Sequence, residues 1–315
     1  MKISLSNRIQ RVKPSPTLAV TALANQLKAE GRDVIGLAAG EPDFDTPDYI
    51  KRAAIDAINK GYTKYTAVDG TASLKQAIIN KFKRENGFDF TAEQILVSVG
   101  GKQAFYNLCM TLLNEGDEVI IPAPYWVSYP DIVKLADATP VIVEGDISQS
   151  FKITAEQLQQ AITDKTKLVI INSPSNPSGK AYTKAELKKL GEVLAKHHEI
   201  VVMSDDIYEH IVWTEEGFVN ILNACPELAD QTVVINGVSK AYSMTGWRIG
   251  YSGGPVDIIK GMKKIQSQST SNPTSIAQYA AQAALEGDQS FLEEMCKVFK
   301  QRHDYVHKTL NAMDG

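Results

Sequence analysis

Short apolar runs alternate with longer amphipathic stretches through the middle of this 315-residue chain, and this alternation is the feature that most constrains its fold. The runs are almost continuously apolar, as strands are when both faces of their sheet are buried. Strands that alternate with helices predict an α/β fold with a mainly parallel sheet sandwiched between two layers of helices. We expect strands over residues 95–99, 118–121, 140–143, 167–172, 200–204 and 232–236, and helices over 102–114, 128–136, 154–162 and 183–196.

The two ends of the chain follow other patterns. Residues 1–16 end in prolines and predict an extended arm, and a helix is expected directly afterwards over residues 17–30. From residue 255 onward the pattern is helical, and residues 288–311 predict one long amphipathic helix.

The composition excludes several classes of function. A net charge of −4 gives no basis for binding nucleic acid or an anionic membrane. No apolar run is long enough to predict a membrane span, and the N-terminus lacks the apolar stretch of a secretory signal. The three cysteines are widely spaced without a CxxC pair, which indicates neither disulfides nor zinc and favours the reducing cytoplasm. His303 and His307 lack the glutamate of a zinc motif, so an exposed helical face is favoured and no metal site is predicted.

One stretch near residue 240 indicates a specific chemistry. A predicted strand ends at Asn236 and is followed by Gly-Val-Ser, then by Lys240, with Arg248 eight residues further on. A lysine amine at a strand end can form an imine with an aldehyde when desolvation or a nearby cation lowers its pKa. Arg248 could supply that cation, or it could bind a phosphate through two parallel hydrogen bonds. The alternative is an exposed lysine and a surface arginine after a turn.

Other predicted strands also end in polar or aromatic residues. Gly101, Lys102 and Gln103 open a helix whose free N–H groups and dipole favour an anion, although a tight connection explains the same sequence. Trp126 could stack on a flat ring or pack in the core. Asn176 lies in an Asn-Pro sequence that is also typical of an ordinary turn.

Two adjacent aspartates, Asp205 and Asp206, follow the strand predicted over residues 200–204, and Tyr208 comes two residues later. A carboxylate in this position could keep a pyridine nitrogen protonated, which makes the ring accept electrons. The residues alone do not choose between the two aspartates, since such a pair most often caps a helix.

Together these motifs resemble the class I aminotransferases, which are fold-type-I enzymes dependent on pyridoxal 5′-phosphate. SKAYSMTGWRIGY resembles their cofactor-lysine motif, and LAAGEPDFDTP, YTKYTAVDG, VSVGGKQAFYNL, PAPYWVSYP, INSPSNPSG and SDDIYEH follow in the family's order. The resemblance covers nearly the whole chain and is nearest to the bacterial aspartate aminotransferase branch, which implies the fold-type-I transferase fold.

The resemblance also implies a role for each candidate residue. Lys240 would hold the cofactor and act as the acid–base, with Asp205 at the pyridine nitrogen and Tyr208 at the phenolic oxygen. Asp206 would then be a helix-start or solvent-facing residue. Gly101, Lys102 and Gln103 would hold the cofactor phosphate mainly through their backbone. The remaining cofactor contacts would come from Trp126, Asn176, Ser239 and Arg248, and the substrate contacts from Gly40, Trp126 and Asn176. Many relatives have a serine where this chain has Gly237, so Ser239 or a backbone amide would cover the phosphate instead.

The family also implies how the chain is organised. Residues 1–46 would form an arm and part of a small domain, residues 47–287 the large cofactor-binding domain, and residues 288–315 the start of a truncated small domain. Relatives are longer and carry a second arginine for the substrate carboxylate, whereas this chain has no arginine after Arg302. Tyr65 matches a tyrosine that reaches the cofactor of the neighbouring subunit, which implies a homodimer with a shared active site.

The predicted activity is transfer of an amino group between an aspartate-like L-amino acid and 2-oxoglutarate by a ping-pong mechanism. Two alternatives use the same motifs. One is a pyridoxal-phosphate-dependent carbon–sulfur β-lyase on the same scaffold, and the other is a cofactor-binding fragment with little activity.

Overall fold

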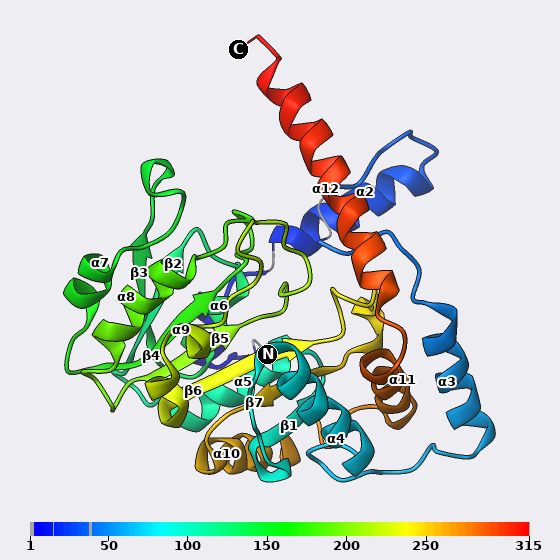
Figure 1. The fold of residues 1–315 in the computed structure, drawn as a ribbon, viewed down its shortest axis with the longest axis horizontal. Helices are drawn as coiled ribbons and strands as arrows, with labels where there is room; N and C mark the ends of the chain where they lie inside the picture. Colours follow the sequence, from blue (N-terminus) through cyan, green and yellow to red (C-terminus); the bar gives the residue numbers. More distant parts are fainter. Residues whose placement is uncertain (1–2, 15, 38–39, 315) are drawn as a thin grey trace.

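A seven-stranded, mainly parallel sheet forms the centre of the protein, as seen in a computed structural model that describes residues 3–14, 16–37 and 40–314. The strand order is β1-β7-β6-β5-β4-β2-β3, and only β7 runs antiparallel to its neighbours (Figure 1). The strands are β1 Ile95–Ser98, β2 Glu118–Ala123, β3 Thr139–Glu144, β4 Thr166–Asn172, β5 Val201–Asp205, β6 Thr232–Gly237 and β7 Gly250–Gly253. All six predicted strands are therefore confirmed.

Helices cover both faces of this sheet, which confirms the predicted three-layer fold. Alternate strand residues point to opposite faces, so Val169 of β4 joins the core beneath α3, α4, α8 and α11, whereas Ile170 joins the core beneath α5, α6 and α10. The helices are α1 Asn7–Gln10, α2 Pro16–Ala29, α3 Asp48–Asn59, α4 Ala72–Lys81, α5 Gly101–Leu112, α6 Ser128–Leu135, α7 Ala155–Ala161, α8 Lys184–Leu194, α9 Ile221–Ala224, α10 Val256–Ser267, α11 Ser275–Glu286 and α12 Ser290–Asn311.

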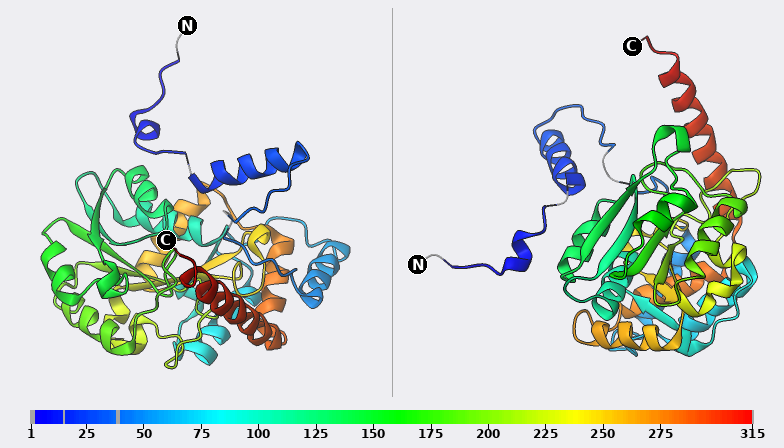
Figure 2. Two further views of the ribbon diagram at one scale, coloured as in Figure 1. Left: turned by 90° about the horizontal axis from the view of Figure 1, so that it is seen from above. Right: turned by 90° about the vertical axis from the view of Figure 1, so that its left-hand side faces the viewer.

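The two ends of the chain extend away from this body. The right view of Figure 2 shows the N-terminal segment with α1 and α2, and the far half of α12, projecting from the layered core. The arm is not fully extended as predicted, because α1 forms a helical turn within it. Arg8 and Arg11 hold this turn through ion pairs of 2.8 and 2.7 Å to Asp137, a contact that local sequence does not reveal.

Strand β7 was not predicted, because its sequence Gly-Tyr-Ser-Gly contains no apolar run. Gly250 is required at its start, since a Cβ there would overlap the backbone of Gly100 and Gly101. The antiparallel pairing of Gly250 with Gly237 brings the segment just before β7, which contains Arg248, to the edge of the sheet where β6 ends.

The carboxyl ends of the parallel strands gather at one edge of the sheet, and the predicted site residues follow these ends. Ligands of open α/β sheets bind at such an edge. None of the helices in the described part of the chain combines the length and apolar character needed to cross a bilayer.

Candidate active site

A cavity of about 500 Å³ lies at the carboxyl edge of the sheet and gathers almost all of the predicted site residues. Its lining includes Gly40, Gly101, Lys102, Trp126, Asn176, Asp205, Tyr208, Ser239, Lys240 and Arg248. These residues come from segments far apart in sequence: Gly40 and Lys240, which are in contact, are separated by 200 positions. The fold therefore brings the separate motifs into one site.

Two predicted residues, Gln103 and Tyr65, do not line this cavity. The side chain of Gln103 turns along α5 and donates a hydrogen bond of 2.8 Å to Asn107. Tyr65 is 92% exposed, and its ring lies in solvent in the single chain. The side chain of Gln103 is thus turned away from the cavity, and its predicted phosphate contact, mainly through the backbone, stays a prediction. A role for Tyr65 requires a second subunit.

Lys240 follows β6 and points into the cavity. Its amine donates to the carbonyl of Gly40 and lies 5.8 Å from the centre of the Tyr208 ring. Burial lowers the pKa of Lys240, and the charge of Arg248 lowers it further, although Glu41 and Asp205 oppose this. A lowered pKa increases the fraction of neutral amine, which is the nucleophilic form.

Asp205 ends β5 at the other side of the cavity. Tyr129 donates to its Oδ2 at 2.5 Å, and the backbone N–H of Ile207 donates to its Oδ1 at 3.3 Å. Burial raises the pKa of Asp205, whereas these hydrogen bonds and the charge of Lys240 oppose the rise. The site thus contains a desolvated carboxyl group that would gain from a cationic partner.

Tyr208 and Asn176 lie between these two groups. Burial, and then the charge of Asp205, raise the pKa of Tyr208 to about 12, although a side-chain hydrogen bond with Asn176 opposes the rise. The phenol is therefore protonated at neutral pH and is available as a donor. The N–H of Asn176 donates to Asn172 Oδ1 at 2.9 Å, and Asn172 Nδ2 donates to the carbonyl of Asp205 at 3.1 Å, so the two strand ends are joined.

Two cations meet at the N-terminus of α5. Arg248 has the unusual φ of +57°, which turns its side chain towards the helix, and its Nη1 donates to the carbonyl of Thr245 at 2.9 Å. A Cβ on Gly100 would overlap this guanidinium, so only glycine leaves room for it. Burial and then the charge of Arg248 lower the pKa of Lys102, whose amine lies 5.0 Å from the centre of the Trp126 ring.

These groups fit pyridoxal 5′-phosphate. Within the described part of the chain, neither Lys102 nor Arg248 forms an ion pair with a carboxylate, and both lie beside the free N–H groups of a twelve-residue helix. Such an arrangement suits a phosphate dianion. Asp205 suits a protonated ring nitrogen, and the amine of Lys240 suits an aldehyde.

The structure corrects one prediction and adds two residues. Asp206 is not solvent-facing: it is 2% exposed and accepts hydrogen bonds from Ser204, at 2.7 Å, and from Asn220. Tyr129 and Asn172 were not predicted, although both contact Asp205. Tyr129 lies in the first turn of α6, and its ring packs edge-on against that of Trp126, which precedes the helix, with 5.3 Å between the ring centres; only this packing links it to the predicted Trp126.

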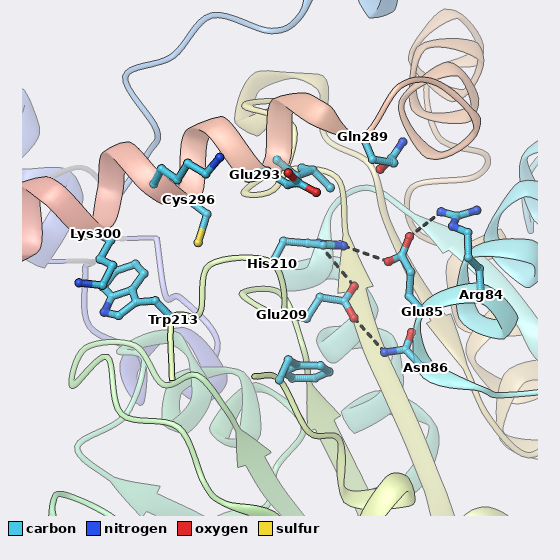
Figure 3. A pocket seen from close by; sticks show the side chains of 13 residues that line it. Arg84, Glu85, Asn86, Glu209, His210, Trp213, Gln289, Glu293, Cys296 and Lys300 are labelled. Carbon is cyan, nitrogen blue, oxygen red and sulfur yellow. Dashed lines mark hydrogen bonds and ion pairs between the residues drawn. The ribbon is translucent and has the colours of Figure 1, made fainter. Parts of the chain in front are cut away.

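A second hollow of about 740 Å³ lies between α12 and the segments around Glu85 and His210, and Figure 3 shows its lining. It is larger than the first, but it contains none of the predicted site residues. Size alone therefore does not identify the reactive cavity of this protein, whereas the convergence of titratable groups does.

Comparisons with known proteins agree with this site. A family model for aminotransferase class I and II matches residues 32–315. An aspartate/prephenate aminotransferase of Nitrosomonas europaea is 61% identical over 313 residues, which are 99% of this chain and 79% of that protein. An aspartate aminotransferase of Geobacillus stearothermophilus is 55% identical over 99% of this chain and 79% of its own length.

Solved structures give the same result. The aspartate aminotransferase of Rhizobium meliloti superimposes with a TM-score of 0.96 at 50% identity, over 100% of this chain and 78% of that chain. The enzyme of Thermus thermophilus with maleate gives a TM-score of 0.95 at 42% identity, over 99% of this chain and 81% of that chain. These alignments do not establish the truncation predicted from the sequence, which stays a prediction. The predicted fold, cofactor and enzyme class are confirmed, and the chain belongs to the class I and II aminotransferase family of pyridoxal-phosphate-dependent enzymes.

Proposed function

We propose that this aminotransferase moves an amino group between aspartate and 2-oxoglutarate in the cavity at the carboxyl edge of the sheet. The observation that carries the proposal is the convergence of the Lys240 amine, the buried carboxyl of Asp205 and the cation pair Lys102 and Arg248 around one space. Each group has a pKa or a location that suits one part of the cofactor.

The cofactor would be held at both of its ends. Arg248, Lys102 and the N–H groups of Gly101 and Gln103 would bind the phosphate, while Ser239 lies beside Lys240 in the same lining. Asp205, oriented by Tyr129, would hold the protonated ring nitrogen. Asn176 and Tyr208 would donate to the phenolic oxygen, and Trp126 offers an aromatic surface to the ring.

Lys240 is the proposed catalytic base and acid. The bound cofactor supplies an electron-accepting ring, which makes the α-proton of an attached amino acid removable. With the cofactor bound, the neutral amine of Lys240 would accept the proton from the substrate α-carbon, and the resulting ammonium would donate it to the cofactor carbon that receives the amino group. Burial keeps this amine neutral more often than it would be in water.

A dicarboxylic substrate is supported by the relatives. Several are named aspartate/prephenate aminotransferases, and the Thermus thermophilus structure contains maleate, a dicarboxylate. Aspartate is therefore the proposed donor, with 2-oxoglutarate as the proposed acceptor. Prephenate, which also carries a 2-oxo acid group, is the second acceptor to test.

A homodimer with a shared site is the proposed assembly. Tyr65 is 92% exposed and lies three residues after Tyr62, whose ring stacks on Tyr279 of α11. The exposed ring could reach a second subunit's phosphate site. We also propose residues 47–287 as the cofactor-binding domain, with residues 1–46 and 288–315 belonging to a smaller domain. The cytoplasm is the proposed compartment, since the three cysteines are free.

The test is an absorbance experiment on the purified protein. Pyridoxal 5′-phosphate should give a visible band that depends on Lys240, and aspartate should convert this band to that of pyridoxamine 5′-phosphate, with release of oxaloacetate. Lys240→Ala should lose cofactor fixation by borohydride. Formation of pyruvate and ammonia from cystathionine, without conversion by aspartate, would instead support the carbon–sulfur lyase.

A further inference from the structure

The side chains at the end of β5 and directly after it lie in two different environments. Asp205 and Tyr208 line the cavity, whereas Asp206 and Glu209 point away from it and are 2% and 5% exposed. The side chains of this loop therefore divide into a reactive set and a buried set. Neither residue of the buried set, Asp206 or Glu209, lines the cavity.

Glu209 is the centre of the buried set. Its carboxylate pairs with Lys81, which is 0% exposed, and accepts a hydrogen bond of 3.0 Å from Asn86. Figure 3 shows Glu209 with Asn86 and His210, and shows Glu85 contacting His210 on the outer side. The Lys81 amine also donates to Asn86 at 2.9 Å, so lysine, asparagine and glutamate form a closed group.

A third contact of Glu209 reaches the neighbouring strand. Asn236 of β6 donates to Glu209 Oε1 at 2.7 Å. Asn236 lies four residues before Lys240, and Glu209 lies directly after Tyr208. The backbone already joins the two strands as far as Asp205 and Asp206, whose N–H donates to the carbonyl of Ile235 at 2.9 Å. The hydrogen bond between Asn236 and Glu209 extends this link, through side chains, to the segment that carries Tyr208.

We propose that Glu209 is a positioning residue, which fixes Tyr208 relative to Lys240 through its hydrogen bond with Asn236, beyond the point where strand pairing fixes Asp205. Lys81 and Asn86 hold the carboxylate in place from the α4 side. The inference rests on the proposed function, because it assigns a role relative to that cavity. A shift of about 1 Å between reacting groups can cost on the order of a hundredfold in rate.

The acidic cluster in the second hollow, beside α12, does not support a metal-binding role there. Glu85, Glu209 and His210 place three possible ligand atoms within 4.8 Å of one another. These groups already pair among themselves, with His210 Nε2 at 2.9 Å from Glu85 and Glu209 paired to Lys81. The arrangement is therefore explained by internal hydrogen bonding.

The test compares two double variants that bury no charge. In Lys81→Met with Glu209→Gln, the glutamine Oε1 still accepts from Asn236, and its amide can donate to Asn86 once the Asn86 amide turns over. In Lys81→Met with Glu209→Met, the side chain keeps a similar length but has no acceptor. Both proteins lack the ion pair between Lys81 and Glu209, so they differ from each other only in the polar link to Asn236 and Asn86.

Gln231→Met is the matched control. Gln231 is buried and precedes β6 at the opposite edge of the sheet, where its amide donates to the carbonyls of Ile200 and His197 at 2.9 and 3.1 Å. This substitution also removes a buried polar link of β6, but far from the cavity. It measures the effect of lost stability alone.

Three measurements decide the outcome: the dissociation constant of pyridoxal 5′-phosphate from the cofactor-free protein, kcat and KM for aspartate, and the melting temperature. The double variant with Glu209→Met should bind the cofactor about 10- to 100-fold more weakly, and its kcat should fall by a larger factor than its KM changes. The double variant with Glu209→Gln should keep a cofactor affinity and a kcat near those of the wild type, and Gln231→Met should lower only the melting temperature.

Equal cofactor affinity and kcat in the two double variants would overturn the positioning role. So would an equal loss in Gln231→Met at the same decrease in melting temperature. If the wild-type protein itself neither binds the cofactor nor reacts with aspartate, the proposed function fails, which is a separate result.

Discussion

Replacement of Arg248 by lysine tests the proposed phosphate site directly. The substitution keeps the positive charge beside Lys102 and α5 but removes the planar pair of donors that a guanidinium offers to phosphate oxygens. Arg248 enters the site from a turn with φ of +57°, and Gly100 leaves space for its head group. Lysine can therefore occupy the space but cannot form the two parallel hydrogen bonds.

The size of the effect follows from one lost hydrogen bond. A hydrogen bond to a charged group contributes about 1.5–3 kcal/mol. At about 1.4 kcal/mol for each factor of ten, Arg248→Lys should weaken binding of pyridoxal 5′-phosphate by about 10- to 150-fold. Lys102 and the α5 N–H groups remain, so binding should not be abolished.

The assay compares two ligands that differ only in the phosphate. Equilibrium titrations of the cofactor-free protein with pyridoxal 5′-phosphate should show the loss, whereas titrations with pyridoxal should not. Arg52→Lys, an exposed position on α3, is the matched control and should change neither titration. An equal loss of affinity for both ligands would refute the reasoning, because the arginine would then act on the ring or on the fold instead of the phosphate.

Three further predictions follow from the same geometry. Gly100→Ala should weaken phosphate binding by a similar factor and lower the melting temperature, because its Cβ would displace Arg248 and its φ of +82° disfavours alanine; unchanged titrations would contradict this. Arg248→Met removes a charge that lowers the pKa of Lys240, so that pKa should rise and the rate of pyridoxal attachment should reach its plateau at higher pH, whereas Arg248→Lys should leave the profile in place. Burial and then the charge of Glu209 raise the pKa of Asp206 from 3.8 to about 7, so the free energy of unfolding of the wild-type protein should fall relative to that of Asp206→Asn as pH rises through this range. Urea unfolding at several pH values should show this difference growing, and a difference that does not change with pH would count against the prediction.

The mainly parallel sheet and the position of the site were predictable from the sequence for a simple reason, whereas the order of the strands was not predicted. The apolar run of β4, Thr166–Asn172, is buried on both faces and pairs in parallel with β2 and β5, as a continuously apolar strand is expected to do. Parallel strands carry their carboxyl ends to one edge, which brings Lys102, Asp205 and Lys240 together although they are far apart in the chain.

The features that were not predicted depend on contacts between distant segments. Strand β7 exists because Gly250 can pass against Gly100 and Gly101, and its own sequence has no apolar run. Tyr129 belongs to the site only because α6 brings its hydroxyl to Asp205. The side chain of Gln103 turns away from the cavity because its amide donates to Asn107 at 2.8 Å, one helical turn further along α5.

The two adjacent aspartates show why residue type alone does not assign a role. Asp205 is the last residue of β5 and Asp206 directly follows it, and their side chains point to opposite sides, as consecutive residues of an extended chain do. Asp205 meets Tyr129 at the cavity, and Asp206 meets Ser204 and Asn220 in the interior. Because the pKa of each carboxyl is raised by burial, neither is stabilised as an anion by the fold alone. Only Asp205 faces a space that can receive a cationic ring. The buried partners of Asp206 and Glu209 hold this orientation in place. The orientation therefore makes the carboxyl of Asp205 a functional group and that of Asp206 a structural one.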